Sequence, residues 1–183
     1  MHRYISFIRG INVGGHKKVK MADLRALYLD LGFRDPRTLL QSGNVIFEAD
    51  ATDMAEVNAR IETGILQRCG FEAQVLLWTP AAFRAALADH PFTAEQLERG
   101  SHAMIVFLSG APDERAVAAL VGNNPGSEAI TAKGQALYVF YTGGVARSKL
   151  DGKRIEKSLG LVASARNWNT CQRLLKLLCE MEA

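Results

Sequence analysis

The chain of 183 residues has few of the groups that mark a metalloprotein, a disulfide-stabilised protein or a common hydrolase. Its three cysteines, Cys69, Cys171 and Cys179, form no CxxC pair and are odd in number, so neither a disulfide framework nor a zinc ribbon is expected. The four histidines are scattered, without an HExxH motif or a cysteine at metal-ligand spacing. A GxSxG nucleophile motif is absent as well. The sequence therefore identifies no metal site, no cofactor and no catalytic residue.

The sequence also lacks a long apolar run. No segment approaches the ~20 apolar residues that a membrane span needs, and the N-terminal stretch carries arginine and no small-residue cleavage site. Hydrophobic residues make up 48% of the chain and charged residues 22%, which is typical of a globular protein with a buried core. The net charge of +3 is small, so any basic surface must come from local clustering. We expect a cytosolic protein without a membrane partner.

Hydrophobic periodicity and turn residues predict the element order β-α-β-β-α-β twice along the chain. The first set comprises strands at 3–9, 37–41, 44–49 and 73–79 and helices at 21–32 and 52–70. The second set comprises strands at 102–109, 128–133, 136–142 and 161–166 and helices at 113–122 and 149–160. A connecting helix begins at Pro80, and an amphipathic helix ends the chain. The order predicts an α+β protein of two tandem ferredoxin-like units, at 1–79 and 93–183, joined by a connecting helix at 80–92.

Several of the predicted strands are apolar on both faces, among them ISFI, MIVFL and YVFY. A ferredoxin-like sheet carries helices on one face only, so its other face needs a cover. We expect that cover to come from the second unit, from a second subunit, or from the connecting and C-terminal helices.

The strand order 4-1-3-2 of a ferredoxin-like unit brings the end of the first strand beside the turn between the second and third strands. The two segments are therefore expected to form one polar, glycine-rich patch. Its residues are Arg9, Gly10, Asn12, Gly14, Gly15, Lys17, Ser42, Gly43 and Asn44. Glycines allow close approach, and successive backbone N–H groups can bind an anion. The spacing fits neither GxGxxG nor GxxxxGK[ST], so a glycine turn with its lysines in solvent is an equal alternative.

The same reasoning predicts a second patch in the second half of the chain, at the ends of its third and fourth strands: Arg147, Ser148, Lys149, Arg166, Asn167, Trp168 and Asn169. Basic residues outnumber acidic ones between 147 and 176. An exposed Trp168 would offer a stacking platform for an anion or a nucleic acid. The alternatives are that Asn167 or Asn169 caps a helix and that Trp168 anchors a core. The aromatic pattern of an RNA-recognition domain is missing from both halves.

Four motifs in the order RGINVGG, QSGNVIF, RSKL and RNWNT resemble one family, the uncharacterised bacterial family catalogued as domain of unknown function 1697. The resemblance covers nearly the whole chain. It implies tandem ferredoxin-like units and supplies no activity. Three hypotheses follow: a binder of a phosphate-bearing small molecule such as a nucleotide, which we rank first; a single-stranded nucleic-acid-binding module that uses the basic cluster at 147–176; and a non-catalytic structural or interaction protein.

Overall fold

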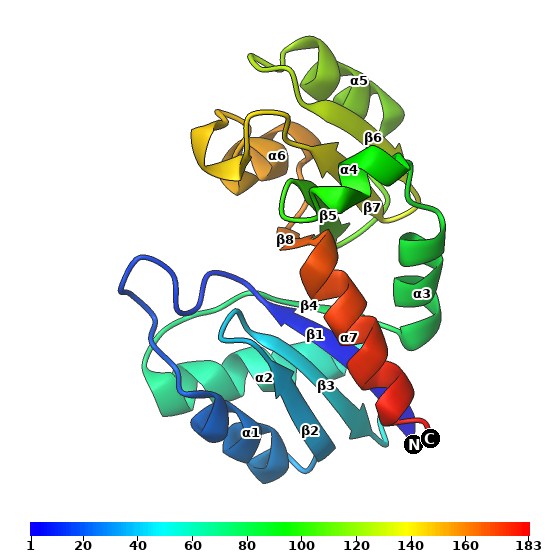
Figure 1. Cartoon of the computed structure of the whole chain (residues 1–183). Coiled ribbons are helices and arrows are strands. Elements are labelled where there is room, and N and C mark those ends of the chain that lie inside the picture. Colours follow the sequence, from blue (N-terminus) through cyan, green and yellow to red (C-terminus); the bar gives the residue numbers. More distant parts are fainter. The chain divides into compact units, whose positions relative to one another are not determined.

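Each half of the chain forms its own four-stranded antiparallel sheet (Figure 1). The computed structural model describes all of residues 1–183. Two compact units can be distinguished, Met1–Phe83 and Arg84–Ala183. With two such sheets and seven α-helices, the protein belongs to the α+β class that the sequence predicted.

In the first unit, β1 is a central strand that pairs with both β3 and β4, and the strand order is β2-β3-β1-β4. Helix α1 contacts β2, and α2 contacts β4 and α1. The elements are β1 (His2–Ile8), α1 (Met21–Asp30), β2 (Arg34–Leu39), β3 (Asn44–Ala49), α2 (Met54–Cys69) and β4 (Val75–Trp78). The loop between β1 and α1 therefore leaves the sheet beside the β2–β3 turn.

The core of the first unit lies between this sheet and the two helices. Helix α2 buries Val57, Ile61 and Ile65, which recur every four residues and so share one face. The rings of Tyr28 on α1 and Phe47 on β3 meet edge to face with centroids 5.0 Å apart. The hydroxyl groups of Tyr28 and Ser6 are hydrogen-bonded at 2.7 Å, which satisfies both polar groups inside the core.

In the second unit the strand order is β6-β7-β5-β8. Helices α5 and α6 contact each other, and together with one face of the sheet they enclose the core. Helix α7 contacts β5 and β8 and buries an apolar stripe that includes Cys171, Leu174 and Leu178. Helix α3 (Pro80–Ala88) contains the boundary between the two units. The elements after it are α4 (Ala94–Glu98), β5 (Ala103–Leu108), α5 (Glu114–Gly122), β6 (Ala129–Lys133), β7 (Ala136–Phe140), the 3-10 turn η1 (Val145–Arg147), α6 (Gly152–Leu159), β8 (Ala163–Asn167) and α7 (Trp168–Glu180).

Most bounds shift by one to three residues from the sequence-based prediction, and two elements differ more clearly. Strand β2 begins at Arg34 rather than at residue 37, and its pairing with β3 shifts register between Arg34 and Arg37. Since β2 is an edge strand, it tolerates both this bulge and Pro36 within it. The short helix α4 was not predicted. A capping box between Thr93 and Gln96 starts it, and five residues are too few to show a helical period.

Candidate functional site

The loop that follows β1 contains a hairpin turn of two residues. Val13 and His16 pair as an isolated antiparallel bridge, and the His16 amide donates to the Val13 carbonyl at 3.3 Å. Gly14 and Gly15 between them have φ angles of 63° and 80°. A type I′ turn needs positive φ at both central positions, and glycine adopts this conformation without strain. The glycine pair therefore turns the chain at the tip of the loop.

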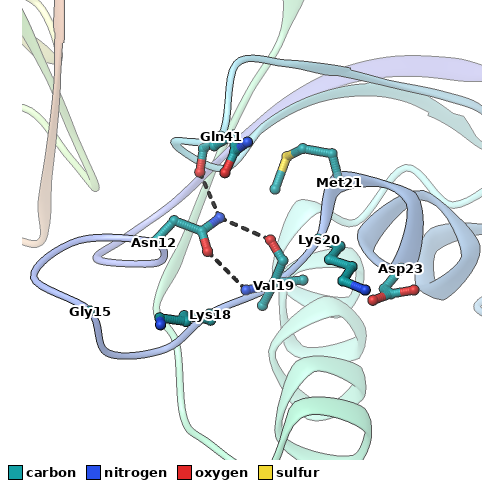
Figure 2. Close-up of a pocket in the computed structure, with 8 residues that line it drawn as sticks. All are labelled: Asn12, Gly15, Lys18, Val19, Lys20, Met21, Asp23 and Gln41. Carbon is teal, nitrogen blue, oxygen red and sulfur yellow. Dashed lines mark hydrogen bonds between the residues drawn. The ribbon is translucent and has the colours of Figure 1, made fainter.

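Asn12 joins the base of this loop to the β2–β3 turn. Its side-chain oxygen accepts from the Val19 amide at 2.9 Å, and its side-chain nitrogen donates to the carbonyls of Val19 at 3.0 Å and Gln41 at 2.8 Å (Figure 2). These bonds confirm that the loop after β1 lies beside residue 41, as the strand order predicted. The Asn12 amide group thereby holds the backbone of both segments.

The β2–β3 turn is packed tightly against the end of β1. The Gly43 carbonyl accepts from the Ile8 amide at 2.8 Å, and a Cβ at Gly43 would lie 2.9 Å from the carbonyl oxygen of Ile8. The Asn44 side chain, fully buried, donates to the Leu39 carbonyl and to the Ser42 hydroxyl, each at 2.9 Å. These three predicted site residues therefore shape the turn. Arg9 is half-buried, and its amide donates to the Gln74 carbonyl at 2.8 Å.

A cavity of about 590 Å³ opens beside Asn12 at the start of α1 (Figure 2). The two cations on its wall are Lys18 and Lys20, and the ammonium group of neither forms a hydrogen bond or an ion pair. Lys17, which the sequence placed in the site, does not line the cavity. Its ammonium group donates to the Glu72 carbonyl at 2.6 Å and lies 5.7 Å from the centre of the Phe71 ring. The lining residues are Asn12, Gly15, Lys18, Val19, Lys20, Met21, Asp23 and Gln41.

The first turn of α1 adds charges of both signs to this cavity. Lys20 precedes the helix in an extended conformation, and its side chain makes no capping hydrogen bond. The first amides of α1, which form the positive end of the helix dipole, are therefore not capped by Lys20. Asp23 in the same turn also lines the cavity and forms no ion pair. Figure 2 shows Lys20 and Asp23 on one side of Val19 and Lys18 on the other.

The predicted second patch contains side chains that mostly serve local structure. The Ser148 hydroxyl donates to the Glu128 carboxylate and accepts from the Leu150 amide at 2.9 Å. The hydrogen bond from Ser148 holds the pKa of Glu128 below its usual value. Arg147 and Lys149 on either side are exposed. In this segment, the two cations are therefore available to a ligand, whereas the Ser148 hydroxyl is bound within the protein.

At the junction of β8 and α7, the predicted site residues are largely embedded. Arg166 is buried and donates to the Ser164 hydroxyl at 2.9 Å, and burial lowers its pKa to about 10. Asn167 caps α7 by accepting from the Thr170 amide at 2.8 Å, which was one of the two predicted alternatives for this residue. The Trp168 ring is half-buried and meets the His90 ring edge to face at 4.6 Å. Asn169 is exposed.

A segment that the sequence did not single out lies between the two parts of the second patch. Strand β5 separates β7 from β8, and the residues before β5 contact the ends of both. The Arg99 guanidinium donates to the Thr142 carbonyl at 3.0 Å, and the Gly100 carbonyl accepts from the Trp168 amide at 3.1 Å. The sequence could not indicate that residues 99–100 lie between the two parts of the patch, because this follows from the position of β5 between β7 and β8.

Neither a metal site nor a membrane span is found in the structure. Nowhere do three or more His, Cys, Asp or Glu side chains gather in a way that could hold a metal ion. No helix combines the length and the apolar character needed to cross a membrane.

Comparison with known proteins gives one family and one fold. The model of a family described as "Protein of unknown function (DUF1697)" matches residues 1–138. No curated protein matches the sequence. Among solved structures, the chain is similar to the conserved bacterial protein SP0830 from Streptococcus pneumoniae, with a TM-score of 0.72 and 24% sequence identity over 97% of this chain and 98% of that chain. This similarity shows the fold and names no ligand.

Proposed function

The chain belongs to the DUF1697 family, and we propose that it binds a small phosphate-bearing anion in the cavity beside Asn12. We also interpret each of its two units as ferredoxin-like. The strand orders β2-β3-β1-β4 and β6-β7-β5-β8, with two helices between the strands of each unit, support that interpretation.

One observation carries the proposal: two lysines without a protein partner, Lys18 and Lys20, line the same cavity. Its volume of about 590 Å³ lies within the range of roughly 300–1,000 Å³ that is usual for small-molecule sites. An ammonium group acts as a point charge with three donors, which suits phosphate oxygens. Against the single carboxylate of Asp23, the two lysines leave the lining residues with an excess of positive charge.

The surrounding structure supports the proposal because it fixes the backbone segment that carries the two lysines. Asn12 fixes the Val19 backbone from both sides, and Lys18 and Lys20 are the neighbours of Val19 in the chain. The first amides of α1 also favour an anion at this point. A site whose backbone is already ordered loses less conformational entropy when the ligand binds.

The experiment is a thermal-shift screen of the whole chain with inorganic phosphate, sugar phosphates, nucleotides and short single-stranded oligonucleotides, each at low and moderate salt. A ligand at 100 times its Kd stabilises the folded state by about 2.7 kcal/mol. For a chain of this size that raises Tm by roughly 5–10 °C. We expect a shift with phosphate compounds that Lys18→Ala and Lys20→Ala each reduce and that the double variant abolishes. For the small phosphate compounds, Lys153→Ala is the matched control, because it removes an exposed lysine on α6, outside this cavity.

Persistence of the full shift in the double variant would show that the anion binds elsewhere. A shift that appears only with oligonucleotides and disappears in salt would favour the nucleic-acid hypothesis, because phosphate-backbone binding releases counterions. That hypothesis depends on the exposed cations of the 147–176 cluster, since Trp168 is half-buried against His90. These cations are Arg147, Lys149, Lys153, Lys157, Arg173 and Lys176.

A further inference from the structure

We infer that the cavity beside Asn12 selects an anion that also carries hydroxyl groups and a planar apolar group, as a nucleoside monophosphate does. This inference rests on the proposed anion site and names the class of ligand that the remaining lining residues fit. It is carried by three features of the wall: the carboxylate of Asp23, the apolar surface at Met21, and the side-chain amide of Gln41.

Asp23 indicates hydroxyl groups on the ligand. An ionised carboxylate in the wall repels a bare phosphate ion, and no basic side chain of the protein forms an ion pair with Asp23. A carboxylate accepts hydrogen bonds and donates none when ionised. A ligand that presents hydroxyl donors beside its anionic group turns this repulsion into hydrogen bonds, as acidic residues do with the ribose hydroxyls of bound nucleotides.

Met21 and Gln41 indicate a planar, nitrogen-containing ring. Met21 is half-buried and packs on the core of the first unit, and its side chain reaches toward Gln41 across the cavity (Figure 2). A thioether adapts its shape and makes favourable contacts with aromatic rings. The Gln41 side chain is exposed and forms no hydrogen bond within the protein. Its amide offers a donor and an acceptor, which matches the edge of a nucleobase.

The spacing of the charges favours an elongated ligand over a compact ion. Lys18 and the Lys20–Asp23 side of the cavity are separated by Val19 (Figure 2). A phosphate ion would fill only a small part of about 590 Å³ and would leave Met21 and Gln41 without a contact. A nucleoside monophosphate has separate anionic, hydroxyl and aromatic parts that can occupy the different parts of this wall.

The test is titration calorimetry of the full chain with four probes: inorganic phosphate, ribose 5-phosphate, adenosine 5′-monophosphate, and the 2′,3′-dideoxy analogue of that nucleotide. For the wild type we expect the nucleotide to bind at least tenfold more tightly than inorganic phosphate, with ribose 5-phosphate between them. The dideoxy analogue should lose about tenfold in affinity. In Asp23→Asn that loss should become smaller, because the amide keeps a hydrogen-bond acceptor but not the charge, while inorganic phosphate binds more tightly. Asp89→Asn, an exposed aspartate in the second unit, is the control and should change neither.

The outcomes separate the two proposals. If none of the probes binds, the anion site itself is refuted. If inorganic phosphate binds through Lys18 and Lys20 but the nucleotide is no tighter, the anion site holds and the inference about the ligand class is wrong. If the dideoxy analogue binds the wild type as well as the nucleotide does, the assignment of hydroxyl groups to Asp23 is wrong. That last comparison needs no variant, so it holds even if Asp23→Asn is poorly folded.

Discussion

Removing the side chain of Asn12 should destabilise the first unit by an amount that its contacts allow us to estimate. The side chain makes three hydrogen bonds to backbone atoms of Val19 and Gln41. A net contribution of roughly 0.5–1.5 kcal/mol per bond gives an upper range of about 1.5–4.5 kcal/mol. The bond to Gln41 is exposed, so water replaces part of it. We expect Asn12→Gly to lower the free energy of unfolding by about 2 kcal/mol.

The backbone conformation of Asn12 separates two variants that remove the same hydrogen bonds. Its φ of 56° lies in the left-handed region, which glycine adopts freely and alanine does not. Asn12→Ala should therefore be less stable than Asn12→Gly by about 1 kcal/mol. Both variants should weaken phosphate binding although Lys18 and Lys20 are intact, because the Val19 backbone between the lysines loses its support.

The measurement is urea unfolding followed by tryptophan fluorescence. Trp78 lies in β4 of the first unit and Trp168 in the second, so a Trp168→Phe background leaves a reporter in the first unit alone. This separation matters because two units can unfold in two transitions. The control is Asn123→Ala, which removes a single exposed bond in the second unit and should leave the Trp78 transition unchanged. Stability of Asn12→Ala within about 0.5 kcal/mol of the wild type would refute the reasoning, because the three bonds would then contribute almost nothing.

Two further predictions concern backbone strain and pH. Gly43→Ala should lower the free energy of unfolding by more than about 2 kcal/mol and Gly14→Ala by only about 1 kcal/mol. Both glycines have positive φ, but an added Cβ would meet the Ile8 carbonyl only at Gly43. Equal losses of stability in a urea titration would contradict the predicted contact. Burial raises the pKa of three groups to about 12: Cys171, Tyr138 and Tyr141. The folded state keeps these protons after the unfolded chain has released them, so the stability they provide is complete below pH 9 and falls as the pH rises toward 12. Burial lowers the pKa of Arg166 to about 10, so its effect on stability has the opposite sign and offsets only part of this loss. The urea midpoint of the wild type should drop between pH 8 and 11, and it should drop less steeply in Cys171→Ala. A midpoint that does not change with pH would contradict the prediction.

The position of the first patch could be predicted from the sequence because it follows from element order. Once β1 and the β2–β3 hairpin are recognised, the strand order brings residue 12 and residue 41 together, and the hydrogen bond between them confirms it. The double glycine at 14–15 indicates a turn for a local reason, its freedom at positive φ. The cap at Asn167 is equally local, since it needs only a side chain three residues from the amide that it binds.

The side chains that face the cavity could not be predicted in this way. Lys17, Lys18 and Lys20 are alike in sequence, and the prediction chose Lys17. In the folded chain Lys17 has a φ of 50°, and its ammonium group lies against Glu72 and Phe71, which are remote in sequence. Lys18 and Lys20 flank the buried Val19 and remain free to line the cavity. Lys17 is held away from the cavity by a contact with a residue more than fifty positions away along the chain, and a local sequence pattern does not contain that information.

The sequence by itself determined the order of the eight strands and of every helix except the short α4, because hydrophobic period, caps and turn residues act within a few positions of one another. The tertiary structure alone decided which charged and aromatic groups reach solvent. It buried Arg166, packed the Trp168 ring against His90, and left Lys18, Lys20 and Asp23 around one cavity. The physical reason is that exposure and charge pairing depend on neighbours from distant segments, and only the packing of those segments fixes which neighbours a side chain has.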